Sequence, residues 1–230
     1  MRTRDASSTL PGVQEASPFL NPLRAASPHH RADFVERIPG VVTSTDKADT
    51  LARLQPHHEA AARRLGFSQT YLAEQIHCDG IAIITPDSPL LSPGVDALIT
   101  RHPLLLGIHV ADCGALSLLD SRSGAIGLLH SGKKGTELNI TGKTIAAMVH
   151  HFETDPSDLV AVLAPCIRPP HYEVDFAATI REQALGAGVR PENYHDCGLC
   201  TATDLDRFYS YRLEKGNTGR HLALLGRLPS

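Results

Sequence analysis

Two histidines and one cysteine stand at the ends of strand-like runs, and their side chains are the ligands that a transition metal would bind. His77 and Cys113 each follow such a run, and His130 ends one. The three runs span residues 69–76, 104–110 and 125–130. Strand ends hold the loops that leave a sheet in fixed positions, so sites often assemble there. Two imidazoles and a thiolate suit Zn²⁺ or copper, and three protein ligands leave a fourth position for water or a substrate.

These three residues therefore predict a catalytic metal site, in which a bound water could lose its proton near neutral pH. The chain has 13 histidines and five cysteines, so residue type alone does not single out this trio. A second hypothesis makes Cys113 the nucleophile of a thiol hydrolase, with His130 or His77 as its base.

A basic turn follows His130 directly. Gly132-Lys133-Lys134-Gly135-Thr136 joins the strand at 125–130 to a helix expected from about residue 137. Free N–H groups at a helix start attract anions, and two lysines add positive charge. The turn is either an anion site beside the metal or a solvated basic loop.

The composition excludes several classes of protein. Lys and Arg number 22 against 25 Asp and Glu, a net charge of −3 that gives no electrostatic argument for nucleic acid or an anionic membrane as partner. No apolar run approaches the roughly 18 residues that span a bilayer, and the N-terminus lacks the apolar core of a secretory signal. The five cysteines do not suggest a disulfide scaffold. We expect a cytoplasmic protein that acts on a small molecule and keeps its thiols reduced.

The elements that must position these residues alternate between short strands and a few helices. Residues 1–33 are rich in Ser, Pro, Ala and Arg, which predicts a flexible or strap-like tail before a single domain at 34–230. Helices are expected near residues 56–66, 137–152 and 177–185. Further strands are expected at 81–85, 97–100, 115–119, 160–164, 208–211 and 221–225. This order predicts an α/β fold with a mixed β-sheet covered by helices.

Several short motifs, taken in order, resemble one known family. They are Gln75-Ile76-His77, Asp96-Ala97-Leu98-Ile99-Thr100, Ala111-Asp112-Cys113, His130-Ser131-Gly132, Tyr172-Glu173-Val174, Tyr209-Ser210-Tyr211-Arg212 and Thr218-Gly219-Arg220. The family is the laccase-domain family, also called multicopper polyphenol oxidoreductases and described as purine nucleoside phosphorylases. The resemblance runs from about residue 39 to 225 and implies an α/β/α layered fold.

The resemblance implies that zinc is bound by His77, Cys113 and His130. It also implies phosphorolysis of purine nucleosides and hydrolytic deamination of adenosine, whereas the older family name implies copper-dependent phenol oxidation. The substrate and phosphate residues that match are Lys134, Lys133, Arg212, Arg220 and Gln75. Lys134 stands in the place of a family arginine and is expected to point into the pocket, with Lys133 toward solvent. The two lysines and an altered N-terminal stretch leave open a metal-binding relative with a degenerate substrate pocket.

Overall fold

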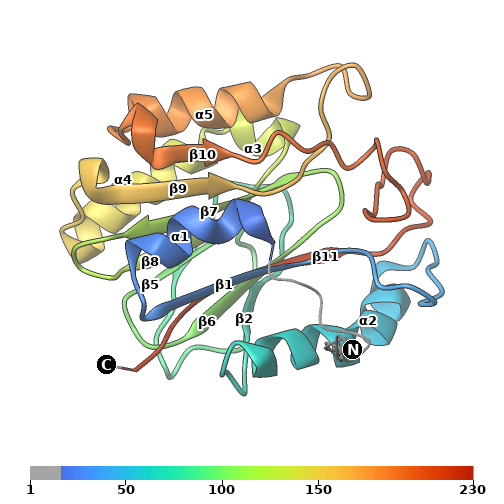
Figure 1. Ribbon diagram of the computed structural model, residues 1–230, viewed down its shortest axis with the longest axis horizontal. Helices are drawn as coiled ribbons and strands as arrows, with labels where there is room; N and C mark the ends of the chain where they lie inside the picture. Colours follow the sequence, from blue (N-terminus) through green and yellow to red (C-terminus); the bar gives the residue numbers. More distant parts are fainter. Residues whose placement is uncertain (1–16, 230) are drawn as a thin grey trace, which may run out of the picture.

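Two β-sheets lie face to face in the computed structural model, which describes residues 17–229, and helices cover their outer sides (Figure 1). The five-stranded sheet has the order β1 (His30–Val35), β11 (His221–Arg227), β6 (Leu105–Val110), β2 (Tyr71–Ala73) and β4 (Leu91–Ser92). The six-stranded sheet has the order β10 (Tyr194–Asp196), β9 (Leu159–Leu163), β7 (Gly114–Asp120), β8 (Ile126–Ser131), β5 (Ala97–Thr100) and β3 (Ile81–Ile83). The helices are α1 (Asn21–Ala26), α2 (Lys47–Arg64), α3 (Lys133–Glu137), α4 (Ile140–Phe152) and α5 (Phe176–Gly186), with 3₁₀ turns at Pro18–Leu20, Pro156–Asp158 and Pro191–Asn193.

Three apolar clusters hold these layers together. One lies between the two sheets, a second lies between the six-stranded sheet and helices α4 and α5, and a third lies beneath α2. Strand β6 contributes to two of these clusters, because successive side chains of a strand point to opposite faces of the sheet. Leu106 and Ile108 lie in the cluster between the sheets, and Leu105 packs toward α2. The α/β class in a single domain is confirmed. The strands form two mixed sheets, whereas the order of the elements in the sequence predicts one.

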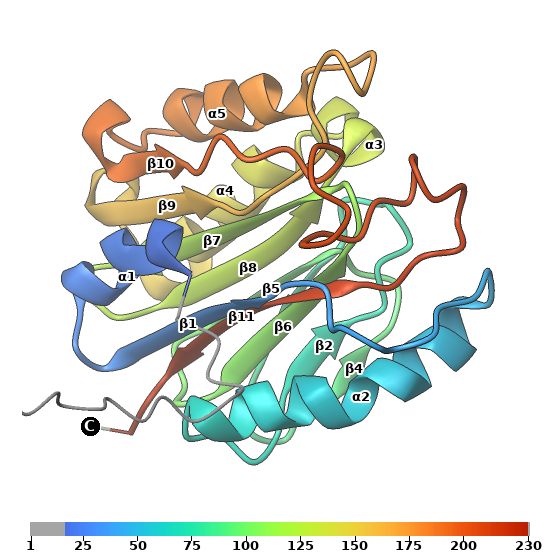
Figure 2. The ribbon, with the colours of Figure 1, turned by 45° about the vertical axis from the view of Figure 1, so that its right-hand side comes forward.

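The pairing of the six-stranded sheet brings three strand ends to one edge. Strand β8 is antiparallel to both of its neighbours, with Ala115 of β7 opposite His130 and Ala97 of β5 opposite Leu129. The end of β8 therefore lies beside the starts of β5 and β7. Figure 2 shows β7 and β8 side by side. Asp96 and Cys113, which immediately precede β5 and β7, meet His130 at this edge.

Helix α2 begins nine residues before the proline at which a helix start was expected. The Asp46 carboxylate accepts hydrogen bonds from the backbone N–H groups of Ala48 and Asp49, which caps the helix at Lys47. Pro56 lies inside the helix. The helix expected over 137–152 is divided into α3 and α4, because Asn139 between them has a left-handed backbone with φ of +55°.

The N-terminal boundary expected at residue 34 also differs from the structure. Strand β1 starts at His30 and pairs with β11, and Leu20 and Leu23 before it are buried in the cluster between the sheets. Residues 17–33 therefore belong to the folded body. The rest of the tail expected at 1–33, residues 1–16, lies outside the described residues.

The strand expected at 208–211 is an irregular segment. The backbone N–H of Tyr209 donates to His221 Nε2, and that of Ser210 donates to Glu214 Oε2, so side chains take the place of a partner strand. All five cysteines are free in this structure. Among residues 17–229, no helix combines the length and the apolar character needed to cross a membrane.

Candidate metal centre and substrate pocket

His77, Cys113 and His130 converge on one point, as the sequence analysis expected. One potential ligand atom from each residue lies within 4.8 Å of the other two. The rings of His77 and His130 are nearly perpendicular, with 4.8 Å between their centroids. His77 lies in the loop after β2, Cys113 in the turn before β7, and His130 near the end of β8. In residues 17–229 this is the one cluster of at least three His, Cys, Asp or Glu side chains with the spacing of a metal site.

Asp96 holds two of these residues in place from behind. One oxygen of its fully buried carboxylate lies 2.6 Å from Nδ1 of His130. The same carboxylate accepts hydrogen bonds from the backbone N–H groups of Ile76, His77 and Cys78, at 2.9–3.1 Å. These contacts stabilise a loop in which His77 has a left-handed backbone, with φ of +61°. They also leave Nε2 of His130 as the nitrogen that a metal would bind.

Cys113 and His130 each stabilise the charged form of the other. Burial raises the pKa of the Cys113 thiol, but the charge of His130 and hydrogen bonds from His130 and His77 outweigh it and lower that pKa to about 6. Burial lowers the pKa of His130, but the Cys113 thiolate and the hydrogen bond to Asp96 outweigh it and raise that pKa to about 9. Cys113 is thus a thiolate at neutral pH, the form that binds metals.

This donor set fits a zinc ion. Zinc is bound by thiolate sulfur and imidazole nitrogen, and a carboxylate behind a ligating histidine is its usual support. The thiolate of Cys113, the exposed ring of His77 and the oriented ring of His130 meet these requirements. The residues could therefore hold a metal ion through three ligands and leave one position toward the cavity.

Asp112, beside Cys113, binds the C-terminal loops to the edge of the six-stranded sheet at which the candidate ligands lie. Its carboxylate accepts hydrogen bonds from the Thr201 and Ser210 hydroxyls and from the backbone N–H of Arg212, at 2.7–3.1 Å. Its backbone has φ of +80°. The position of Cys113 therefore depends on segments about 90 to 100 residues further along the chain.

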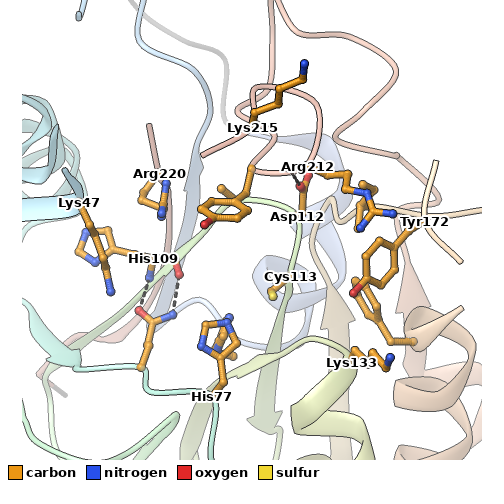
Figure 3. A pocket seen from close by; sticks show the side chains of 16 residues that line it. Lys47, His77, His109, Asp112, Cys113, Lys133, Tyr172, Arg212, Lys215 and Arg220 are labelled. Carbon is orange, nitrogen blue, oxygen red and sulfur yellow. Dashed lines mark hydrogen bonds between the residues drawn. The ribbon is translucent and has the colours of Figure 1, made fainter. Parts of the chain in front are cut away.

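A cavity of about 620 Å³ opens over the three candidate ligands (Figure 3). Its volume lies within the usual range of about 300–1,000 Å³ for small-molecule sites. Three aromatic side chains line it: Tyr172, Phe176 and Tyr211. Five basic side chains also line it: Lys47, Lys133, Arg212, Lys215 and Arg220. The cavity therefore offers flat apolar surfaces and positive charge around the candidate metal position.

The structure places the other expected site residues unequally. Arg212 and Arg220 line the cavity. Lys133 lines it and Lys134 does not, the reverse of the expected orientations. The two lysines open α3, where successive side chains diverge by about 100° around the helix axis, so only one can face the cavity.

Gln75 also lines the cavity, but its side-chain amide is already paired. Its Nε2 donates to the backbone carbonyl of His109, and its Oε1 accepts from the backbone N–H of the same residue. Gln75 therefore acts like a segment of strand that joins the His77 loop to β6. The family resemblance predicts a contact with substrate for Gln75 instead.

Several residues of the site were not assigned a role from the sequence. Asp96 and Asp112 belong to motifs that were recognised, and their places beside predicted strand ends were a usable signal. His109 precedes Cys113 by four residues, and the sequence offered these two residues as another possible pair of metal ligands. Lys47 and Lys215 carried no such signal. They reach the cavity from α2 and the loop before β11, and only the tertiary fold brings these segments together.

Comparisons with known proteins point to one family. The profile of the family described as multi-copper polyphenol oxidoreductase laccase matches residues 40–177 and 173–227. A protein of Deinococcus radiodurans named purine nucleoside phosphorylase is 31% identical, over 95% of this chain and 94% of its own. Purine nucleoside phosphorylase YlmD of Geobacillus stearothermophilus is 26% identical, over 92% of each chain.

Two solved structures have a similar fold. The crystal structure of YlmD from Geobacillus stearothermophilus aligns with a TM-score of 0.77 at 24% identity, over 87% of this chain and 93% of that one. Protein NMB0706 of Neisseria meningitidis aligns with a TM-score of 0.75 at 20% identity, over 88% and 96%. With the profile covering most of the described chain, the protein belongs to the multi-copper polyphenol oxidoreductase laccase family.

Proposed function

We propose that this protein is a zinc-dependent purine nucleoside phosphorylase. The observation that carries the proposal is one cavity that combines a three-ligand metal position, aromatic surfaces and basic side chains. Aromatic rings suit the faces of a purine base, and charge-assisted hydrogen bonds suit phosphate. The names of the relatives from Deinococcus and Geobacillus support the same reaction.

In this reaction inorganic phosphate attacks C1′ of the nucleoside. A C1′–O bond forms, the C1′–N9 bond breaks, and the proton of the monohydrogen phosphate passes to the ring of the leaving base. The aromatic wall, including Tyr172 and Tyr211, would bind and orient the base, while the basic side chains would hold the phosphate beside the sugar. Exclusion of water from the cavity would strengthen these electrostatic contacts.

His77, Cys113 and His130 would hold the metal, and Asp96 would fix the orientation of His130. When bound, a zinc ion supplies Lewis acidity toward an oxygen of substrate or water. Two imidazoles and one thiolate in a single cluster favour zinc over the several copper centres that the family name implies. Deamination of adenosine, also expected from the resemblance, would use the same cavity with water in place of phosphate.

The test is metal analysis of the purified protein beside a turnover screen with adenosine and inosine. We expect about one zinc per chain, and release of adenine or hypoxanthine that requires phosphate. Inosine formed from adenosine without phosphate would reveal deamination. Loaded protein that releases no base under either condition would contradict the phosphorylase assignment.

The thiolate–imidazolium pair of Cys113 and His130, with Asp96 behind the histidine, favours one second candidate, a thiol hydrolase. The two candidates respond oppositely to a chelator. Removal of the metal abolishes a metal-dependent activity and unmasks Cys113 to alkylation, whereas a thiol hydrolase keeps its activity and already reacts with iodoacetamide. Identical alkylation of Cys113 with and without chelator would contradict the ligand role.

A further inference from the structure

Arg220 is a partly buried cation without a carboxylate partner. Among the ion pairs of residues 17–229, none includes Arg220. Its Nη1 donates to the backbone carbonyls of Thr218 and Gly219, and its guanidinium lies 5.6 Å from the ring centroid of Tyr211. Burial lowers the pKa of Arg220. A buried charge that is not neutralised is costly, and an anion in the cavity would remove that cost.

Lys47 adds a second positive charge on the same side of the cavity. It opens α2, and the ion pairs of the described chain do not include it either. Partial burial lowers the pKa of Lys47, and the charge of Arg220 lowers it further. Two cations that repel each other on one side of a cavity define a position where an anion is favoured.

His109 completes this group with a neutral ring. Its backbone is fixed by Gln75, and its ring packs 5.2 Å from that of His58. Burial lowers the pKa of His109 to about 3, so the ring is uncharged at neutral pH. No side chain or backbone group of residues 17–229 hydrogen-bonds to its ring nitrogens, and the residue lines the cavity. A neutral imidazole accepts a hydrogen bond from the hydroxyl of a monohydrogen phosphate.

The opposite side of the cavity offers a weaker anion site. The Arg212 guanidinium is paired with Glu173 at 3.1 Å and lies over the ring of Tyr172. Lys133 is exposed, and Lys134 does not line the cavity. In Figure 3, Lys47, His109 and Arg220 lie on one side of His77 and Cys113, with Lys133 and Tyr172 on the other.

We propose that Arg220, Lys47 and His109 form a phosphate-binding subsite, with the two cations donating to phosphate oxygens and the imidazole accepting from a P–OH group. The occupant is inorganic phosphate, an identification that rests on the proposed phosphorylase function. The side with Tyr172 and Lys133 is then left for the nucleoside. This arrangement places the phosphate across the metal position from the basic turn expected from the sequence.

The experiment is a ³¹P NMR titration of the zinc-loaded protein with potassium phosphate. Lys47→Ala and Arg220→Lys each remove one contact, and the loss of one charge-assisted contact should weaken binding roughly tenfold to a hundredfold. Arg63→Ala is the matched control, because this substitution removes a charge from the far end of the same helix, where Arg63 pairs with Glu59. Circular dichroism checks that each variant is folded.

A phosphate affinity that is unchanged in both Lys47→Ala and Arg220→Lys would overturn the subsite. A parallel titration with adenosine and adenosine 5′-monophosphate separates the possible sources of a phosphate group. Binding of the nucleotide that requires Lys47, with no binding of free phosphate, would overturn the assignment to inorganic phosphate. Since binding is measured without turnover, Lys47-dependent phosphate binding in a protein that cleaves no nucleoside would contradict the proposed function alone.

Discussion

Asp96 shows how one buried carboxylate can organise a metal site without touching the metal. Its carboxylate contacts the side chain of His130 and accepts from three backbone N–H groups of the loop that contains His77. Asp96 therefore couples two candidate ligands from separate segments of the chain. The pKa of Asp96 is lowered, because the hydrogen bonds from His130 and Cys78 outweigh its burial. Asp96 is therefore a charged acceptor at every pH at which the site would bind a metal.

Asp96→Asn should lower zinc affinity roughly tenfold to a hundredfold. The amide nitrogen that replaces one carboxylate oxygen cannot accept, so the contacts of that oxygen with His130 or with the loop are lost. Competition with a chromophoric chelator measures the affinity. Asp79→Asn is the control, since Asp79 is partly exposed and pairs with Lys143 outside the site. Equal zinc affinity in the Asp96 variant and the wild type would contradict the role of Asp96.

The junction between β8 and α3 requires a residue without a side chain. A Cβ atom on Gly132 would overlap Sγ of Cys113, because the turn passes directly over that sulfur. The backbone of Gly132 has φ of −116°, which other residues adopt readily. The requirement for glycine there is therefore steric and is set by Cys113.

Gly132→Ala should displace the Cys113 sulfur and weaken zinc binding while the fold is retained. Gly186→Ala is the matched control, because a Cβ atom at that helix end meets nothing within 4 Å. Zinc content after dialysis, measured beside thermal unfolding, distinguishes a local effect from a global one. Full zinc occupancy in Gly132→Ala would contradict the steric requirement for glycine at this position.

Helix α2 brings Lys47 to the cavity only if its first turn is intact. Asp46→Ala removes the side chain that caps this turn and should cost about 1 kcal/mol of stability. Urea denaturation measures the loss. Glu59→Ala, which removes an exposed pair with Arg63 on the same helix, should cost about 0.5 kcal/mol or less. An Asp46 variant as stable as the wild type would contradict the capping role.

The molecule as a whole carries a cluster of buried histidines where α2 meets the five-stranded sheet. Burial lowers the pKa of His58 to about 4 and that of His221 to about 3, so both are neutral in the folded state. In the unfolded chain both regain a pKa near 6.5. The unfolded state therefore binds more protons below that pH, and stability is lost as the pH falls.

Each of these two histidines should remove about 2 kcal/mol of stability between pH 7 and pH 5. Urea denaturation at the two pH values measures the total drop. His58→Gln should reduce it by about one histidine's share, while His150→Gln, on the exposed end of α4, should leave it unchanged. A drop that is the same in all three proteins would contradict this origin of acid sensitivity.

Much of the site's chemistry was readable from the chain. Cys113 and His130 sit at strand boundaries that apolar runs mark clearly, and β5 has the bounds that its run predicts. The identity of the three candidate ligands and the mixed α/β class followed from residue type, local periodicity and motif order. These signals are local, so they can be interpreted without knowing which strands pair.

The remaining features depend on contacts between distant segments. The division of the strands into two sheets, the packing of residues 17–33 and the irregular path of 208–211 are decided by partners more than 10 residues away. The choice of Lys133 over Lys134 depends on the phase at which α3 begins. Lys47, His109 and Arg220 meet because α2, β6 and β11 pack together, and no local pattern encodes that meeting. Side-chain type and strand ends are local properties of a chain, whereas the charge and shape of a cavity belong to surfaces that exist only after the sheets and helices have packed.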